Sequence, residues 1–473
     1  MLPLVVAVLM LVSSSTCGEN PAVQVVLNNK GLQYGKHVGA GWIQDRLKLF
    51  SLPEISGKVL DIHYTLSGIN ITQCDFPEPS VEFYQNITGF KTSTSGLSVA
   101  LAGEWATRLG FIHDGGSFTM AIFSLDVTSA VELGKDADGH LSVTSQHCDA
   151  RVGDVDVRFR GGASWMFQPF VKYFKGRIKG EIERSLCSYV EKSIANLESH
   201  LQAMNVSFEV GQDFTFDFPL TGAPVVDASS MNLGLKGEFY DIKSHTEPPF
   251  VSKPFTMPQQ PGYMLSMGLS EFTLNSYLYR LYSAGLLQVL ITDSMIPPSF
   301  PLHLNTSSMG PYIPQLPKLF PDLLMTLLVY ARETPMFSFQ PGVVKLDFQG
   351  VVKASAIQPN GTETPLFKLN ADLKSSGKVW IDGDRLKGSM TMDNFTLTLA
   401  SSEVGTFQTV PLEKLTKTEL ELGFAKLNAK LANGFVLPRM KHAELVHTVL
   451  GVEEGFIAIS SDAQVSLTDR GFN

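Results

Sequence analysis

The sequence predicts an α+β protein built from two related modules joined head to tail. The chain has 473 residues, more than one hydrophobic core usually organises, and a proline-rich segment divides it near the middle. Each half also repeats one order of elements, namely helix, strands, long helix and last strand. We therefore expect domains at residues 19–240 and 263–473, joined by a linker at 241–262.

The first 18 residues form an apolar run followed by small residues, which is too short to span a bilayer comfortably. We expect residues 1–18 to be a cleaved signal peptide. Six Asn-x-Ser/Thr sequons agree with export and are candidate glycosylation sites. They are Asn70, Asn86, Asn205, Asn305, Asn360 and Asn394. The sequence thus predicts a secreted glycoprotein.

The N-terminal half begins with a short predicted strand at residues 22–28 and a helix at residues 30–50. Four glycines weaken that helix by roughly 1 kcal/mol each relative to alanine, so it needs packing to form. Residues 57–160 have a strand-like pattern, clearest at residues 154–160 (DVDVRFR), where apolar and charged residues alternate. Such a sheet has one face exposed to solvent, and another element must cover its apolar face.

A long amphipathic helix at residues 164–201 supplies that cover. Its apolar residues recur at almost constant four-residue spacing and form one stripe. They are Phe170, Phe174, Ile178, Ile182, Leu186, Val190, Ile194 and Leu197.

Three cysteines remain after the predicted cleavage, and in an oxidising compartment two of them are expected to pair. Cys74, Cys148 and Cys187 allow three pairs by sequence alone. Cys187 follows Leu186 in the long helix, and Cys148 lies just before the alternating strand. A bridge between these two would join helix to sheet and stabilise by roughly 3 to 4 kcal/mol through a loop of about 40 residues. We predict this pair.

The middle of the chain, residues 235–272, has five prolines between Pro248 and Pro261 and no sustained period. We expect all of it to run extended, as neither helix nor central strand. Beyond it the order repeats, with a helix at 269–290 running into a strand, strands at 343–353 and 390–399, a second long helix at 411–432 stopped by Asn433-Gly434, and a last strand at 456–460.

The sequence contains no catalytic or metal-binding motif that we can support. It has no G-x-S-x-G, H-E-x-x-H, P-loop or G-x-G-x-x-G, and its ten histidines lack metal-ligand spacing. Residues 135–140 (KDADGH) begin like a calcium loop but lack the later acidic ligands, so we expect a hairpin turn. We expect no enzyme and no cofactor. The apolar stripes are then either ordinary core or the walls of elongated cavities for acyl chains.

Several segments resemble one protein family. LKGEFY, EPPF, MGLSEFTLNSYLYRLYSAG and DSMIPPSFPLHL lie in and after the linker, and NGFVLP lies near the end. They resemble the family of bactericidal/permeability-increasing, lipopolysaccharide-binding, phospholipid transfer and cholesteryl ester transfer proteins, over the whole mature chain. The resemblance implies a two-barrel boomerang around a shared central sheet, each barrel being a strongly twisted antiparallel sheet wrapped on a long helix. It also implies a phospholipid in an apolar pocket of each barrel, and the Cys148–Cys187 bridge.

In the two endotoxin-binding members the tip of the N-terminal barrel is strongly basic. Here the corresponding turn, residues 103–116, has only Arg108 against Glu104 and Asp114, and residues 19–240 carry a net charge of −7. A basic segment at residues 170–180 partly restores the endotoxin interpretation. The candidate phosphate contacts are Arg46, Lys48, Arg108, Lys172, Lys175, Arg177 and Lys179. Trp105 and Phe111 are the candidate membrane or acyl contacts, and Phe170, Phe174, Ile178, Ile182 and Leu186 are the candidate pocket wall.

The sequence therefore favours an innate-immune lipid-binding protein that binds the lipid A part of bacterial lipopolysaccharide at the Gram-negative outer membrane surface. Phospholipid is its expected bound ligand, nucleic acid is not an expected partner, and the oligomeric state stays open. A phospholipid transfer protein is the first alternative, favoured by the net charge of −9. An adaptor that binds a host receptor and has vestigial pockets is the second.

Overall fold

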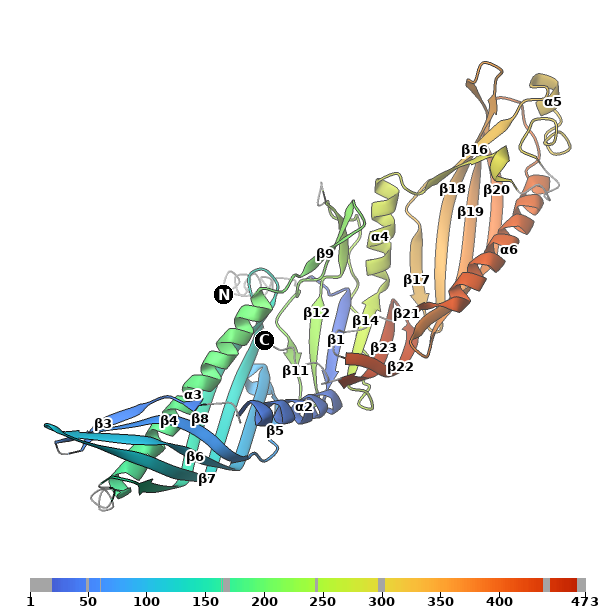
Figure 1. Ribbon diagram of the computed structural model, residues 1–473. Helices are drawn as coiled ribbons and strands as arrows, with labels where there is room; N and C mark the ends of the chain where they lie inside the picture. The colour runs from blue at the N-terminus through green and yellow to red at the C-terminus, as the bar shows by residue number, and fades with distance from the viewer. Residues whose placement is uncertain are drawn as a thin grey trace, which may run out of the picture.

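The computed structural model describes residues 19–47, 51–59, 61–162, 164, 171–242, 246–296, 303–436 and 443–465. The protein is elongated, with one module at each end and a sheet between them (Figure 1). The predicted α+β fold with a boomerang of two modules is confirmed. The expected signal peptide lies outside the described residues. Among the helices described, none has both the length and the apolar character needed to cross a membrane.

The central sheet is shared by the two halves of the chain, as expected. Its strand order is β11-β12-β1-β14-β23-β22, with all neighbours antiparallel. The first half contributes β11 (Val225–Val226), β12 (Ser230–Leu235) and β1 (Val23–Asn28), and the second contributes β14 (Leu265–Ser270), β23 (Phe456–Val465) and β22 (Ala443–Glu453). The halves meet where β1 pairs with β14, with Val25 opposite Met267.

The N-terminal module is a curved antiparallel sheet in the order β2-β4-β6-β7-β8. Its strands are β2 (Ser51–Leu52), β4 (Ile62–Asp75), β6 (Gly89–Leu109), β7 (Ile112–Lys135) and β8 (Leu141–Arg160), with β3 (Ile55–Val59) on β4 and β5 (Ser80–Tyr84) on β6. Helix α2 (Asn29–Leu47) follows β1 and lies between this sheet and the central one (Figure 1).

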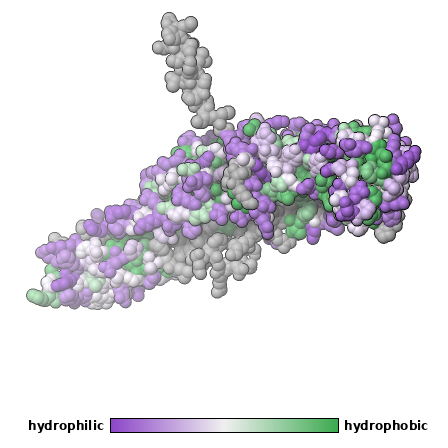
Figure 2. Space-filling view, turned by 90° about the horizontal axis from the view of Figure 1, so that it is seen from above, coloured by the Kyte–Doolittle hydropathy of each residue, from purple (hydrophilic) through white to green (hydrophobic). Residues whose placement is uncertain are grey.

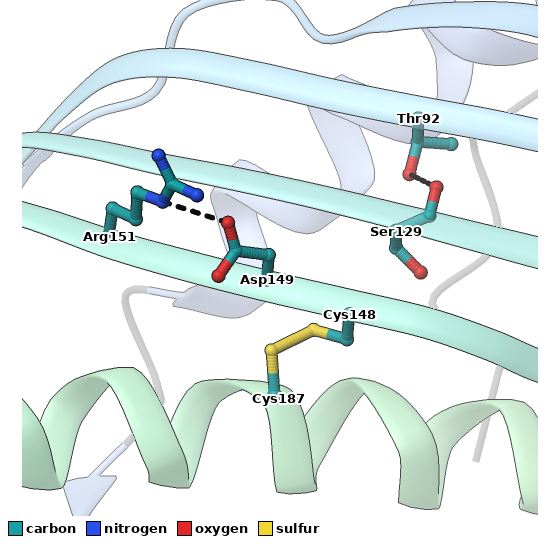
Figure 3. Close-up of a disulfide and its surroundings, with 6 residues drawn as sticks. All are labelled: Thr92, Ser129, Cys148, Asp149, Arg151 and Cys187. Atoms are coloured by element: carbon teal, nitrogen blue, oxygen red, sulfur yellow. Dashed lines mark hydrogen bonds and ion pairs between the residues drawn. A yellow bond between two sulfur atoms is a disulfide. The ribbon is translucent and has the colours of Figure 1, made fainter.

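The long helix α3 (Val171–Gln202) runs along β8. The Cys148–Cys187 disulfide is present and joins β8 to α3, with 5.6 Å between the Cα atoms (Figure 3). Two acidic side chains add to the attachment, since Glu183 accepts a hydrogen bond from the amide of Val152 at 2.8 Å and Glu198 from that of Val143 at 2.5 Å. These contacts occupy outward amides of β8, so the helix also covers the edge of the sheet.

The C-terminal module repeats this plan in the order β15-β16-β18-β19-β20-β21, with β17 on β18. Its strands are β15 (Gln288–Thr292), β16 (Met325–Ala331), β17 (Met336–Gln340), β18 (Val343–Ile357), β19 (Glu363–Asp382), β20 (Arg385–Ser402) and β21 (Phe435–Val436). Helix α6 (Val410–Asn433) lies on β20, and its Glu413 accepts a hydrogen bond from the amide of Leu397 at 3.0 Å. This contact is the counterpart of Glu183 on Val152 and supports the predicted relation between the halves.

The remaining elements lie near the module junction and at the far end. Helix α4 (Glu271–Ser283) follows β14, α5 (Leu316–Leu319) lies at the outer end of the C-terminal module, and a small sheet has the order β13-β10-β9 (Figure 1). Its strands are β9 (Ser207–Val210), β10 (Phe214–Asp217) and β13 (Glu238–Asp241).

The expectation that all of residues 235–272 run as an extended linker is wrong. Residues 246–264 have neither helix nor strand, but β14 is a central strand and α4 begins at Glu271. The alternation in β14 is hidden because its buried positions are the small residues Ser266, Gly268 and Ser270. The linker packs over them, since a Cβ on Gly268 would overlap Met257 and Phe255. The predicted helix at 269–290 is correspondingly shorter.

Candidate functional site

The basic segment of α3 lies near the free end of the N-terminal module, and its four cations have different surroundings. Lys172 and Arg177 are exposed, whereas Lys175 and Lys179 are half-buried. Lys175 Nζ lies 3.6 Å from a carboxylate oxygen of Asp156, and Lys179 Nζ donates to the carbonyl of Gly153 at 3.3 Å. Lys172 and Arg177 are therefore the cations most accessible to an external phosphate.

The tip of the module is a hairpin of two long strands. β6 ends at Leu109 and β7 begins at Ile112, so the turn is shorter than the expected loop at residues 103–116. Leu109 is 42% exposed, Phe111 103% and Ile112 68%. Figure 2 shows the narrow end of the N-terminal module from above. The tip thus offers three apolar side chains to the surroundings, of which our sequence interpretation named only Phe111.

Trp105 does not lie on this surface, which corrects the expectation that it contacts lipid beside Phe111. It is 3% exposed, packs edge-on against Phe159 and donates its indole N–H to the carbonyl of Arg160 at 3.1 Å. Burial of both the ring and its donor is typical of a core tryptophan. The sequence does contain the signal, because Val99, Leu101 and Trp105 share one face of a strand with period 2.

Arg108 is separated from the cations of α3. Its Nε donates to the carbonyl of Gly110 at 3.3 Å, and its backbone is paired with His113. Lys175 lies beside Asp156, which is paired with Ala121. Eight residues of extended strand separate His113 from Ala121, about 26 Å at 3.3 Å per residue. Lys175 and its neighbours on α3 therefore do not form one compact patch with Arg108. The side chain of Arg46 and all of Lys48 lie outside the described residues.

The apolar stripe of α3 faces the inside of the N-terminal module. Ile178 is 1% exposed and Ile182 6%, and both belong to a core cluster formed by β3, β4, β6, β7 and β8, with Leu186 packed against it. Phe170 and the side chain of Phe174 lie outside the described residues. The described part of the predicted pocket wall, Ile178, Ile182 and Leu186, is thus in contact with ordinary core residues.

Burial of the stripe decreases toward the central sheet, and the same gradient occurs on both long helices. On α3, Tyr189 is 52% exposed and Leu197 49%. On α6, Leu412 near the start is 5% exposed, whereas Leu427 near the end is 39% exposed. The helices end beside the central sheet (Figure 1). At the inner end of α3, however, Ile194 and Leu201 pack against a second core cluster. The apolar side chains of the two stripes that stay partly uncovered there are Leu197 on α3 and Leu427 on α6.

Comparison with known proteins gives the family. The model of the N-terminal domain of the LBP / BPI / CETP family matches residues 31–204, and that of the C-terminal domain matches residues 209–465. A bactericidal permeability-increasing protein from Sebastes schlegelii is 36% identical over 456 residues, which cover 95% of this chain and 96% of that protein. The chain belongs to the LBP / BPI / CETP family.

Other members of the LBP / BPI / CETP family match over nearly the whole chain. The human lipopolysaccharide-binding protein is 26% identical over 471 residues, covering 98% of each chain. The crystal structure of a lipopolysaccharide-binding protein is similar with a TM-score of 0.57 at 24% identity, and covers 94% of this chain and 99% of that one. The structural likeness supports the shared fold. The two family models meet between residues 204 and 209, and our linker boundaries at 241–262 stay a prediction.

The remaining candidate residues of this LBP / BPI / CETP member lie at the surface. Five of the sequon asparagines are exposed and Asn305 is half-buried. The β7–β8 connection at residues 136–140 is a tight turn, as predicted. In it, Asp136, Asp138 and His140 are close enough to hold a metal ion. Asp136 already accepts hydrogen bonds from the amides of Asp138 and His140, and these bonds account for the geometry of the turn.

Proposed function

We propose that the protein is a secreted, glycosylated innate-immune lipid-binding protein that binds the lipid A part of bacterial lipopolysaccharide. Its partners would be lipopolysaccharide, phospholipid and the Gram-negative outer membrane surface. It would act without a catalytic step or a resident cofactor. The relatives with the names bactericidal permeability-increasing protein and lipopolysaccharide-binding protein support the endotoxin part of this proposal.

The observation that carries the lipid part is the partly uncovered apolar surface at the inner ends of α3 and α6. Side chains such as Leu197 and Leu427 lose roughly 25 cal/mol for each Å² of apolar surface left in water. Acyl chains laid along the two stripes would remove that surface from water. We infer one apolar pocket in each module, with Ile182 and Leu186 near its closed end in the N-terminal module.

The tip would contact the membrane in two ways. Leu109, Phe111 and Ile112 are free to enter the acyl region, where an exposed aromatic gains most by burial. Lys172 and Arg177 would contact phosphates further along the module, and Lys175 would have to exchange Asp156 for a phosphate. The arrangement differs from a strongly basic tip, because its outermost residues are apolar and Arg108 is the nearest cation in the hairpin.

Vesicle binding tests this proposal. Affinity for lipid A vesicles should exceed affinity for phosphatidylcholine vesicles and should fall as salt screens the phosphate contacts. Equal affinities with a flat salt dependence would contradict endotoxin binding. That result would favour a phospholipid transfer protein, which the net charge of −9 and the apolar tip also fit.

A further inference from the structure

The outer edge of β15 is an open strand edge at the margin of the C-terminal sheet. Among the described residues, β16 is its one strand neighbour, and the pairing runs from Gln288↔Tyr330 to Thr292↔Thr326 without a bulge. An edge strand carries backbone N–H and C=O groups along its outer side that can pair with a further strand. The unbroken register of β15 on β16 suits such pairing.

The side chains of this segment do not discourage pairing. Residues 286–292 read LLQVLIT, with no charge and no proline. Leu286 is 53% exposed, Val289 47% and Leu290 49%. Proteins usually protect edges with lysine, proline, bulges, short strands or a covering element. Apolar residues also gather at the end of the molecule formed by the C-terminal module (Figure 2).

Other sheet edges in the described part of the chain carry such protection. β2, β11 and β21 have two residues each. β22 has a register shift between Val446 and Val449, β9 carries Glu209, and α3 covers β8. β15 is longer than β2, β11 and β21 and carries neither a charge nor a register shift, so it is better suited than these edges to accept a partner strand.

We propose that β15 pairs antiparallel with β15 of a second copy of this chain, with Leu290 on the two-fold axis. In that register Leu290 faces Leu290 of the partner subunit, Val289 faces the partner's Ile291, and Gln288 faces the partner's Thr292. Apolar residues thus meet apolar residues and polar residues meet polar ones. Because the segment is uncharged, no like charges oppose each other across the axis. A two-fold axis also gives a closed dimer and not a chain of copies.

This pairing links the two C-terminal sheets and leaves both N-terminal tips free. It does not depend on which lipid the protein binds. Five residue pairs form a small interface, so the dimer should dissociate on dilution.

Sedimentation of the purified protein over a concentration series tests the proposal. The protein should show a reversible monomer–dimer equilibrium. Leu290→Lys and Leu290→Glu should each raise the dissociation constant by roughly tenfold or more, because like charges then meet on the axis. An equimolar mixture of the two variants should restore the dimer, since Lys faces Glu. Val225→Lys, at a 69% exposed position of β11, is the matched control and should leave the dimer unchanged.

Three results would overturn the proposal. They are a monomer at all concentrations, a dimer that both Leu290 variants retain, and a mixture that stays monomeric although circular dichroism shows both variants folded. The last result would exclude the register in which Leu290 faces Leu290 of the partner subunit.

Discussion

Replacing Phe111 by Ser tests the role of the apolar tip. The Phe111 side chain is fully exposed, so all of its apolar surface can leave water when the tip enters a membrane. Complete burial of a phenylalanine is worth about 1.5 to 3 kcal/mol. Phe111→Ser should therefore weaken vesicle binding by roughly 10- to 100-fold. The free energy of unfolding should change by less than about 0.5 kcal/mol, because an exposed turn residue leaves no cavity.

Co-sedimentation with vesicles of phosphatidylcholine and of lipid A measures this effect on both surfaces. The loss should occur on both, since insertion of an apolar side chain does not depend on the headgroup. Phe208→Ser is the matched control, because Phe208 is 53% exposed on β9, far along the chain from the tip. Unchanged binding of Phe111→Ser to both kinds of vesicle would refute insertion of the tip.

Three other changes test the α3 cations, the disulfide and the central sheet. Replacing Lys172, Lys175 and Arg177 together by Ser should lower the affinity for lipid A vesicles and flatten the salt dependence of that affinity. Replacing Arg184 and Lys192 on the same helix by Ser is the control and should change neither. Equal effects of the two sets in a vesicle titration would show that the three cations do not contact lipid A phosphates. Replacing Cys148 and Cys187 by Ala should lower the free energy of unfolding in urea by about 4 kcal/mol, since the bridge spans 39 residues, and a loss below about 1 kcal/mol would show that α3 is held without it. Asp462 on β23 forms an ion pair with Lys30 of α2, with 2.8 Å between the carboxylate oxygen and Lys30 Nζ. Desolvation raises the pKa of Asp462, but the contacts with Lys30 and the Met264 amide outweigh it and hold that pKa below its usual value. This stabilisation is present above the ordinary carboxyl pKa and lost as pH falls below it, so Asp462→Asn should reduce the acid sensitivity of unfolding; an unchanged pH profile would contradict it.

The strands and long helices of both modules could be predicted from local patterns. Alternation at residues 154–160 and the four-residue spacing through Ile178, Ile182 and Leu186 depend on which face of an element is buried, and sequence records that directly. The disulfide followed from the same placement, since Cys187 lies on α3 and Cys148 on the strand beneath it.

The centre of the molecule could not be predicted in the same way. β14 buries Ser266, Gly268 and Ser270, because the linker packs over them and the Ser266 hydroxyl bonds that of Ser460 at 2.8 Å. A strand whose buried face is small and polar has no hydrophobic period to read. Its place was fixed by contacts from residues nearly 200 positions away.

The tip was misread for a related reason. Trp105 and Phe111 are both aromatic residues near a turn, but the register of β6 places Trp105 inside and the turn places Phe111 outside. Composition does not distinguish these positions, whereas continuing the alternation from Val99 through Leu101 does. The sequence also contains an apolar run at this turn, which includes Leu109 and Ile112.

The central claim is that the inner ends of α3 and α6 line containers for fatty chains. Mass spectrometry of an organic extract from the purified protein tests it most directly. The account predicts phospholipid at about two molecules per chain, one for each module. Protein that is folded and yields no stoichiometric phospholipid would contradict it.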